Sequence, residues 1–196
     1  MSKEAQTGPD SPTAVAPIPF FPRLVATGLF SGYLPGPAGT WGSIVGALIY
    51  YALPWSERTI VLLPLIAISF FIGARVSAII AAVEGHRLSK VSEFAKSRFQ
   101  PGPHGAADPS IVVIDEIVGM WVSVLLLPKN PLVLLASFCL FRIFDILKPY
   151  PAGRLERVRG GWGIMLDDLI AAIYANASVH LLLFFLTLAL PGFLLQ

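Results

Sequence analysis

Five carboxylates stand in or beside apolar runs of this sequence. Asp115 and Glu116 interrupt the run IVVIDEIVGMW at 111–121, Asp145 lies in FRIFDILKP, and a second adjacent pair, Asp167 and Asp168, ends GIMLDD. A charge inside a membrane helix costs about 2.5–3.5 kcal/mol on insertion scales, so such residues usually serve a function. We therefore expect the five carboxylates to meet at one site.

Clustered carboxylates repel one another, and the loss of surrounding water strengthens the repulsion, so a cluster of this kind requires a cation. Carboxylate oxygens without His or Cys neighbours suit a hard ion, and Mg²⁺ usually keeps water ligands and bridges to phosphate oxygens. The residue types therefore predict a Mg²⁺-phosphate site, and Asp115, Glu116, Asp145 and Asp168 are the candidate metal ligands. For phosphoester hydrolysis, all five acids are candidate catalytic groups, including the base that takes a proton from water.

Basic and hydroxyl side chains near these acids are candidates for holding a phosphate. Arg142 precedes Asp145 by three residues on the same helix face, so it can clamp a phosphate or pair with that carboxylate. Lys148 follows one turn later. Thr40 and Ser43 open another apolar run, where they can contact the phosphate or cap a helix.

Each acid also has a purely structural explanation. The helix dipole favours acids in a first helical turn by about 0.3–1 kcal/mol, and this applies to both adjacent pairs. Asp145 is expected at a helix C-terminus, where the dipole disfavours an acid, so its placement favours function more strongly. A salt bridge from Asp145 to Arg142 or Lys148 is the alternative.

The composition is that of an integral membrane protein. The 196 residues are 55% hydrophobic and 13% charged, whereas a soluble domain carries about 25% charged residues. The net charge of +2 is too small to indicate nucleic-acid binding. One cysteine, Cys139, excludes an internal disulfide and a zinc-type Cys/His cluster. No obligate protein partner is inferred.

Apolar segments predict an all-α, polytopic membrane helix bundle with about five membrane-embedded helices, one of which could be re-entrant. Residues 1–22 are polar and Pro-rich and are expected to form a flexible tail, and 23–196 a single membrane domain. The segment 23–33 is too short to cross a bilayer and is expected to lie at the interface. A polar loop is expected over 84–109, with a basic helical stretch that is either interfacial or solvated. The expected spans are 41–55, 59–83, 111–127, 132–147 and 164–190.

Five spans place ten Lys and Arg residues in the segments on one side and only Arg58 and Lys129 on the other. Loops rich in Lys and Arg stay in the cytoplasm, so the N-terminus is expected inside and the C-terminus outside. If the short first span is re-entrant, the C-terminus changes sides relative to the N-terminus. With this topology all five acids lie at the cytoplasmic face of the membrane. A phosphate site at that depth suits a phosphorylated lipid headgroup.

Four motifs together resemble the phosphatidylglycerophosphatase A family over about 30–176. They are GTWGS at 39–43, Asp108 seven positions before the Asp of IDEIVGMW, FRIFDILKPYP at 141–151 and GGWGIMLDD at 160–168. The resemblance implies a Mg²⁺-dependent enzyme of the bacterial inner membrane that hydrolyses phosphatidylglycerophosphate to phosphatidylglycerol and phosphate. It adds Asp108 as a candidate metal or orienting residue, although Asp in a Gly/Pro-rich loop often stabilises a turn. Ala38 departs from the proline that relatives usually have before GTxGS.

The rival hypothesis is a membrane carrier of divalent cations or phosphate, since clustered acids in membranes also line ion paths. A carrier is expected to place its acids at mid-membrane depth and often to contain two repeated halves. Neither pattern is visible in this sequence. The phosphatase hypothesis is therefore preferred.

Overall fold

The structure is a computed structural model that describes residues 19–95, 111–155, 158 and 161–189, with only the backbone described for 81–95. These residues form helices and connecting turns and contain no strand, which confirms the all-α prediction. The elements are α1 (Phe20–Ala26), the 3₁₀ turn η1 (Ser31–Tyr33), α2 (Ala38–Ala52), α3 (Thr59–Ala95), α4 (Ile114–Ser123), α5 (Pro131–Leu147), α6 (Ala152–Leu155) and α7 (Gly161–Ala189).

Within the described residues, two helical segments are long and apolar enough to cross a bilayer. They are 22 residues of α3, Thr59–Ile80, and the 29 residues of α7. Large apolar side chains are exposed on them, such as Ile60 at 83% and Leu188 at 65%, as expected for helices that face lipid. With 15, 10 and 17 residues, α2, α4 and α5 are shorter than the roughly 20 needed for a full span. Five membrane-embedded helices therefore remain a prediction.

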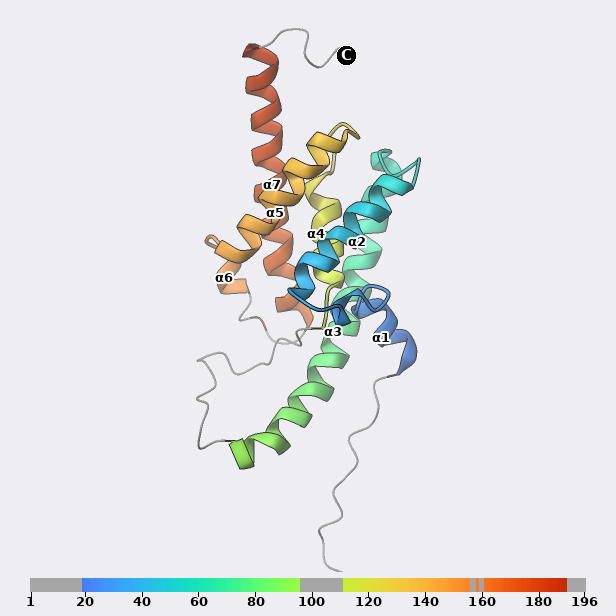
Figure 1. Ribbon diagram of the computed structural model, residues 1–196, viewed down its shortest axis with the longest axis vertical. Coiled ribbons are helices and arrows are strands. Elements are labelled where there is room, and N and C mark those ends of the chain that lie inside the picture. The colour runs from blue at the N-terminus through green and yellow to red at the C-terminus, as the bar shows by residue number, and fades with distance from the viewer. Residues whose placement is uncertain (1–18, 96–110, 156–157, 159–160, 190–196) are drawn as a thin grey trace, which may run out of the picture.

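The short helix α4 lies at the centre of the bundle and packs against α2, α3, α5 and α7 (Figure 1). Every residue of α4 except Glu116 is buried. Glycines of α2 allow the closest approach: a Cβ added at Gly46 would lie 3.0 Å from the Cα of Ile117. Trp121 Nε1 donates a hydrogen bond to the Gly46 carbonyl at 3.0 Å, which fixes α4 against α2.

Both ends of α4 differ from the predicted helix over 111–127. At its start, the Val113 amide donates to the Ala26 carbonyl at 2.8 Å, so this residue joins the end of α1 rather than the helix. Beyond Ser123, Asn176 Nδ2 donates to the carbonyls of Ser123 at 3.2 Å and Leu125 at 2.8 Å. These carbonyls therefore have a side-chain partner, and the helix can end inside the bundle.

The N-terminal part of the chain also differs from expectation. The structure divides the predicted element 23–33 into α1 and η1, because residues 28–30 all have positive φ. The segment 84–109 does not begin as a loop, since α3 continues without a break to Ala95. The helical stretch predicted within that segment is confirmed as far as Ala95, but it is the end of α3 and not a separate helix. Segment 84–95 contains no proline, and half of its residues are good helix formers, so no residue in it forces the helix to end. The rest of that loop, and the tail up to residue 18, lie outside the described residues.

Candidate functional site

Three of the predicted acids meet where α4 and α7 begin. One carboxylate oxygen from each of Asp115, Glu116 and Asp168 lies within 4.8 Å of the other two. Asp115 and Asp168 are buried, with 9% and 4% of their surface exposed, whereas Glu116 is half-buried. The first turn of α4 supplies one adjacent pair, and the second turn of α7 supplies Asp168. Residues more than 50 positions apart in the sequence thus form one carboxylate cluster.

The other two predicted acids lie beside this cluster, and each pairs with a basic side chain. Asp145, in the last turn of α5, lies close enough to Asp168 for the two carboxylate charges to interact. Its Oδ2 atom is 2.7 Å from Arg142 Nη1, the i,i+3 pairing expected on one helix face. Asp167 Oδ2 accepts a hydrogen bond from Lys148 Nζ at 2.8 Å. Acids from α4, α5 and α7 are therefore gathered at one end of the bundle.

The carboxylate cluster has the donor chemistry of a hard-metal site. Its possible ligand atoms are all oxygens, which suit Mg²⁺, Ca²⁺ or Mn²⁺. Glu116 Oε2 and Asp168 Oδ2 are buried and have no hydrogen-bond partner within the described part of the chain. Buried carboxylate oxygens are costly without a partner, and a divalent cation would provide one. Asp115, Glu116 and Asp168 therefore fit a metal ion, and Asp145, the predicted fourth ligand, lies next to them.

Arg142 and Lys148, predicted to steady a phosphate, each make an ion pair. Arg142 pairs with Asp145, which is the alternative that the sequence left open, whereas Lys148 pairs with Asp167. The Arg142 side chain is 15% exposed and that of Lys148 30% exposed, so both are partly accessible from the exterior. An Arg guanidinium has five donors and a Lys ammonium three, so each retains capacity for a phosphate oxygen. Their roles toward phosphate remain predictions.

The two predicted hydroxyl residues have different environments. Ser43 is fully buried, and its Oγ donates to the Gly39 carbonyl at 2.8 Å within α2. Thr40 is half-buried in the first turn of α2. Neither caps the helix, because the N-cap residue is Pro37 and no side-chain capping bond is formed there. Asp108, the remaining candidate, lies outside the described residues.

Gly39 contributes to the site in a way that the sequence interpretation missed. A Cβ at this position would collide with Glu116 Oε1 and lie 2.8 Å from Arg142 Nη1. The absence of a side chain therefore gives both groups their present positions. Gly39, Gly42 and Gly46 recur at i, i+3 and i+7 of α2, and such stripes of small residues mark close helix approach in membrane proteins. This spacing could have indicated that α2 lies directly against the acid-bearing helix.

Comparisons with known proteins agree with this geometry. The sequence model of the family described as phosphatidylglycerophosphatase A matches residues 97–183. A phosphatidylglycerophosphatase A of Haemophilus influenzae is 34% identical over 155 residues, covering 78% of this chain and 83% of the relative. One of Escherichia coli K12 is 30% identical over 163 residues, covering 81% of each chain.

A Bacteroides thetaiotaomicron protein, provisionally described as a phosphatidylinositol-3-phosphatase, is 32% identical over 163 residues. The alignment covers 80% of this chain and 89% of that relative. No solved structure matches the chain. All three relatives are described as phosphatases that act on phospholipids.

Proposed function

Because this chain belongs to the phosphatidylglycerophosphatase A family, we propose that it hydrolyses phosphatidylglycerophosphate to phosphatidylglycerol and inorganic phosphate. The observation that carries the proposal is the convergence of acids from α4, α5 and α7 beside Arg142. The descriptions of the relatives favour this reaction over a carrier of divalent cations or phosphate.

We infer that the metal is Mg²⁺, held by Asp115, Glu116 and Asp168. The support is an all-oxygen donor set in which Glu116 Oε2 and Asp168 Oδ2 are buried and have no hydrogen-bond partner among the described residues. When bound, such an ion would neutralise phosphate charge and lower the pKa of a water molecule.

The remaining charged residues supply orientation and proton transfer. The Arg142 guanidinium binds a phosphate oxygen, and its contact with Asp145 holds the guanidinium in position. A water oxygen forms a bond to phosphorus as the bond from phosphorus to the glycerol oxygen breaks. Asp145 or Asp167, each oriented by a basic partner, takes the proton from the water. The proton taken by that carboxylate passes to the leaving glycerol oxygen, which completes phosphatidylglycerol and returns the carboxylate to its charged form.

We place the protein in the bacterial inner membrane, with α2, α4 and α5 embedded beside the two longer helices and the site at the cytoplasmic face. Lys148 lies at the acid-rich end of the bundle, because it pairs with Asp167. Lys129 contacts the Leu53 carbonyl and Ser56 beyond the other end of α2. The Arg residues that follow Lys148 belong to the same predicted loop, so the acid-rich end carries the larger positive charge typical of a cytoplasmic face.

The test is phosphate release from phosphatidylglycerophosphate by the purified full chain in detergent, with Mg²⁺ or with a chelator. We expect release with Mg²⁺ and at least about a hundredfold less with the chelator or in Glu116→Gln. Glu57→Gln is the matched control, because it makes the same change at an exposed acid remote from the cluster. Unchanged turnover in the chelator would refute the metal mechanism. Faster release from phosphatidylinositol 3-phosphate than from phosphatidylglycerophosphate would refute the substrate.

A further inference from the structure

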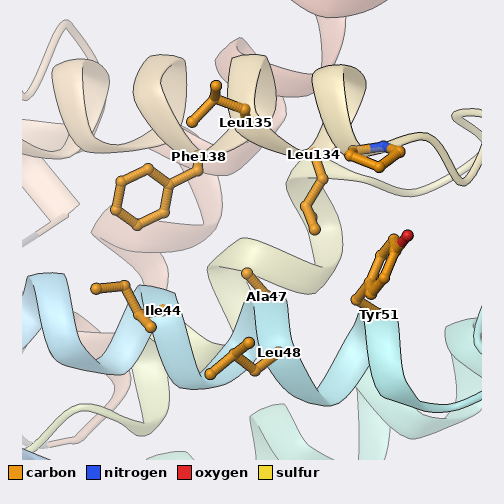
Figure 2. Close-up of a pocket in the computed structure, with 8 residues that line it drawn as sticks. Ile44, Ala47, Leu48, Tyr51, Leu134, Leu135 and Phe138 are labelled. Atoms are coloured by element: carbon orange, nitrogen blue, oxygen red, sulfur yellow. The ribbon is translucent and has the colours of Figure 1, made fainter.

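An apolar groove with a volume of about 460 Å³ lies between α2 and α5. Figure 2 shows side chains of the two helices facing each other across it. Apart from the Tyr51 phenol, its lining side chains are hydrocarbon. The volume is within the usual range for sites that bind small molecules, about 300–1,000 Å³. Its main lining residues are Ile44, Ala47 and Tyr51 from α2 and Leu134, Leu135 and Phe138 from α5.

The groove leads to the carboxylate cluster along both helices. In α2, Thr40 precedes Ile44 by one turn on the same face, and in α5, Arg142 follows Phe138 by one turn on the same face. The start of α2 and the end of α5 lie together, because a Cβ at Gly39 would be 2.8 Å from Arg142 Nη1. At the end nearest the carboxylate cluster, the apolar groove therefore meets the Arg142 guanidinium and the Thr40 hydroxyl.

This arrangement matches an amphiphile with a phosphate at one end and a hydrocarbon chain at the other. Between Ile44 and Tyr51 the groove follows α2 for seven residues, or about 10 Å. Two of the residues that line the groove, Leu48 and Leu135, are 63% and 58% exposed, so the groove is open along its side to the exterior. A lipid chain could enter sideways from a bilayer without passing through the protein.

We propose that this groove holds one acyl chain of the phospholipid whose phosphate is hydrolysed, an inference that rests on the proposed function. A bilayer interior is as apolar as the groove, so moving the chain between them gains little from the hydrophobic effect. The groove instead restrains the lipid, which brings its headgroup to Arg142 in a limited range of orientations. It also discriminates between chains by shape.

The first test measures where a lipid chain lies. The full chain is placed in phosphatidylcholine vesicles with phosphatidylglycerophosphate that carries a photoreactive diazirine midway along one acyl chain. We expect this probe to label Leu48 and Leu135 at several times the level given by phosphatidylcholine with the same chain. The two probes should label Leu182, an exposed residue of α7, equally. Equal labelling of Leu48 and Leu135 by both probes would mean that bulk lipid occupies the groove. Cross-links between two copies of the chain through the groove would mean that a second copy occupies it. Either result overturns the proposal.

Labelling requires no hydrolysis, so the two proposals can fail separately. Selective labelling without phosphate release leaves the groove assignment standing and refutes the reaction. Phosphate release without selective labelling refutes the groove and leaves the reaction.

The second test fills the groove. Ala47→Phe is expected to lower kcat/KM for phosphatidylglycerophosphate about fivefold or more, mainly by raising KM, because the larger side chain occupies the space for the acyl chain. Ala52→Phe makes the same change at an exposed position on α2 outside the groove, and we expect it to stay within about twofold of the unmodified enzyme. Equal effects of the two substitutions would overturn the proposal.

If Ala47→Phe does not fold, Ile44→Ala provides the same test by enlarging the groove. We expect it to raise the preference for branched over straight acyl chains about threefold or more, because the added space accommodates a methyl branch. An unchanged preference would overturn the proposal.

Discussion

Substitution of Gly39 by alanine separates the stability of the fold from the geometry of the site. The added Cβ would collide with Glu116 Oε1 and approach Arg142 Nη1 to 2.8 Å and Nη2 to 3.0 Å. These atoms are the ends of flexible side chains and can move without disturbing a backbone. We therefore expect Gly39→Ala to fold normally but to displace a candidate metal ligand and a candidate phosphate ligand together.

The size of the displacement follows from the contact distances. Arg142 Nη1 must recede from 2.8 Å to the 3.4 Å of ordinary contact, about 0.6 Å, and Glu116 must recede further. Misplacement of a reacting group by about 1 Å can cost about a hundredfold in rate, so we expect kcat/KM to fall by about 10- to 100-fold. Alanine is favoured over glycine in a helix by up to about 1 kcal/mol, so the thermal midpoint should be unchanged or higher.

The assay is phosphate release from phosphatidylglycerophosphate with Mg²⁺, measured beside thermal unfolding of the same sample in detergent. Gly153→Ala is the matched control, because a Cβ there meets only ordinary contacts, the nearest being the Lys148 carbonyl at 3.4 Å. Activity that falls only together with the midpoint would mean a folding defect. Full activity in Gly39→Ala would refute the assignment of Glu116 and Arg142 to the reaction.

Three further predictions concern the acids and the helix that presents them. Asp168→Asn removes one member of the carboxylate cluster, so Mg²⁺ should no longer raise the thermal midpoint; an undiminished rise would contradict the metal assignment. Lys148→Met removes the 2.8 Å pair with Asp167 and should lower kcat/KM about tenfold, with part regained in Lys148→Arg, whereas full activity of the methionine variant would exclude this role. Asn176→Leu removes the donor to the Ser123 and Leu125 carbonyls; we expect a loss of about 1–3 kcal/mol in denaturant unfolding, and an unaltered free energy of unfolding would show that this contact is dispensable.

The gathering of acids at one end of the bundle could be predicted from the sequence. Asp115 stands near the start of one apolar run, Asp145 near the end of the next and Asp168 near the start of a third. Consecutive helices in a bundle alternate in direction, so these positions must share an end. The i,i+3 spacing of Arg142 and Asp145 likewise predicted a possible ion pair, which the structure contains.

The contacts between helices could not be predicted in the same way. Periodicity identifies the face of a helix but not its neighbour, so the pairing of Lys148 with Asp167 instead of Asp145 depends on how α5 meets α7. The short length of α4 depends on Asn176, more than 50 residues later in the chain. Continuous apolar sequence beyond Ser123 gives no sign of that donor, which is why the predicted helix was too long.

The placement of the α4 N-terminus at the carboxylate cluster has a consequence for metal affinity. Aligned peptide dipoles give a helix N-terminus about half a positive charge, and Asp115 and Glu116 occupy the first turn of α4. The protein backbone therefore offsets part of the acids' charge before any ion arrives. The cluster then attracts a divalent ion less strongly than the same carboxylates would if they were not at a helix N-terminus. We expect an ion that exchanges readily with the surrounding solution, so that enzyme stripped by a chelator regains activity when Mg²⁺ is returned, without refolding.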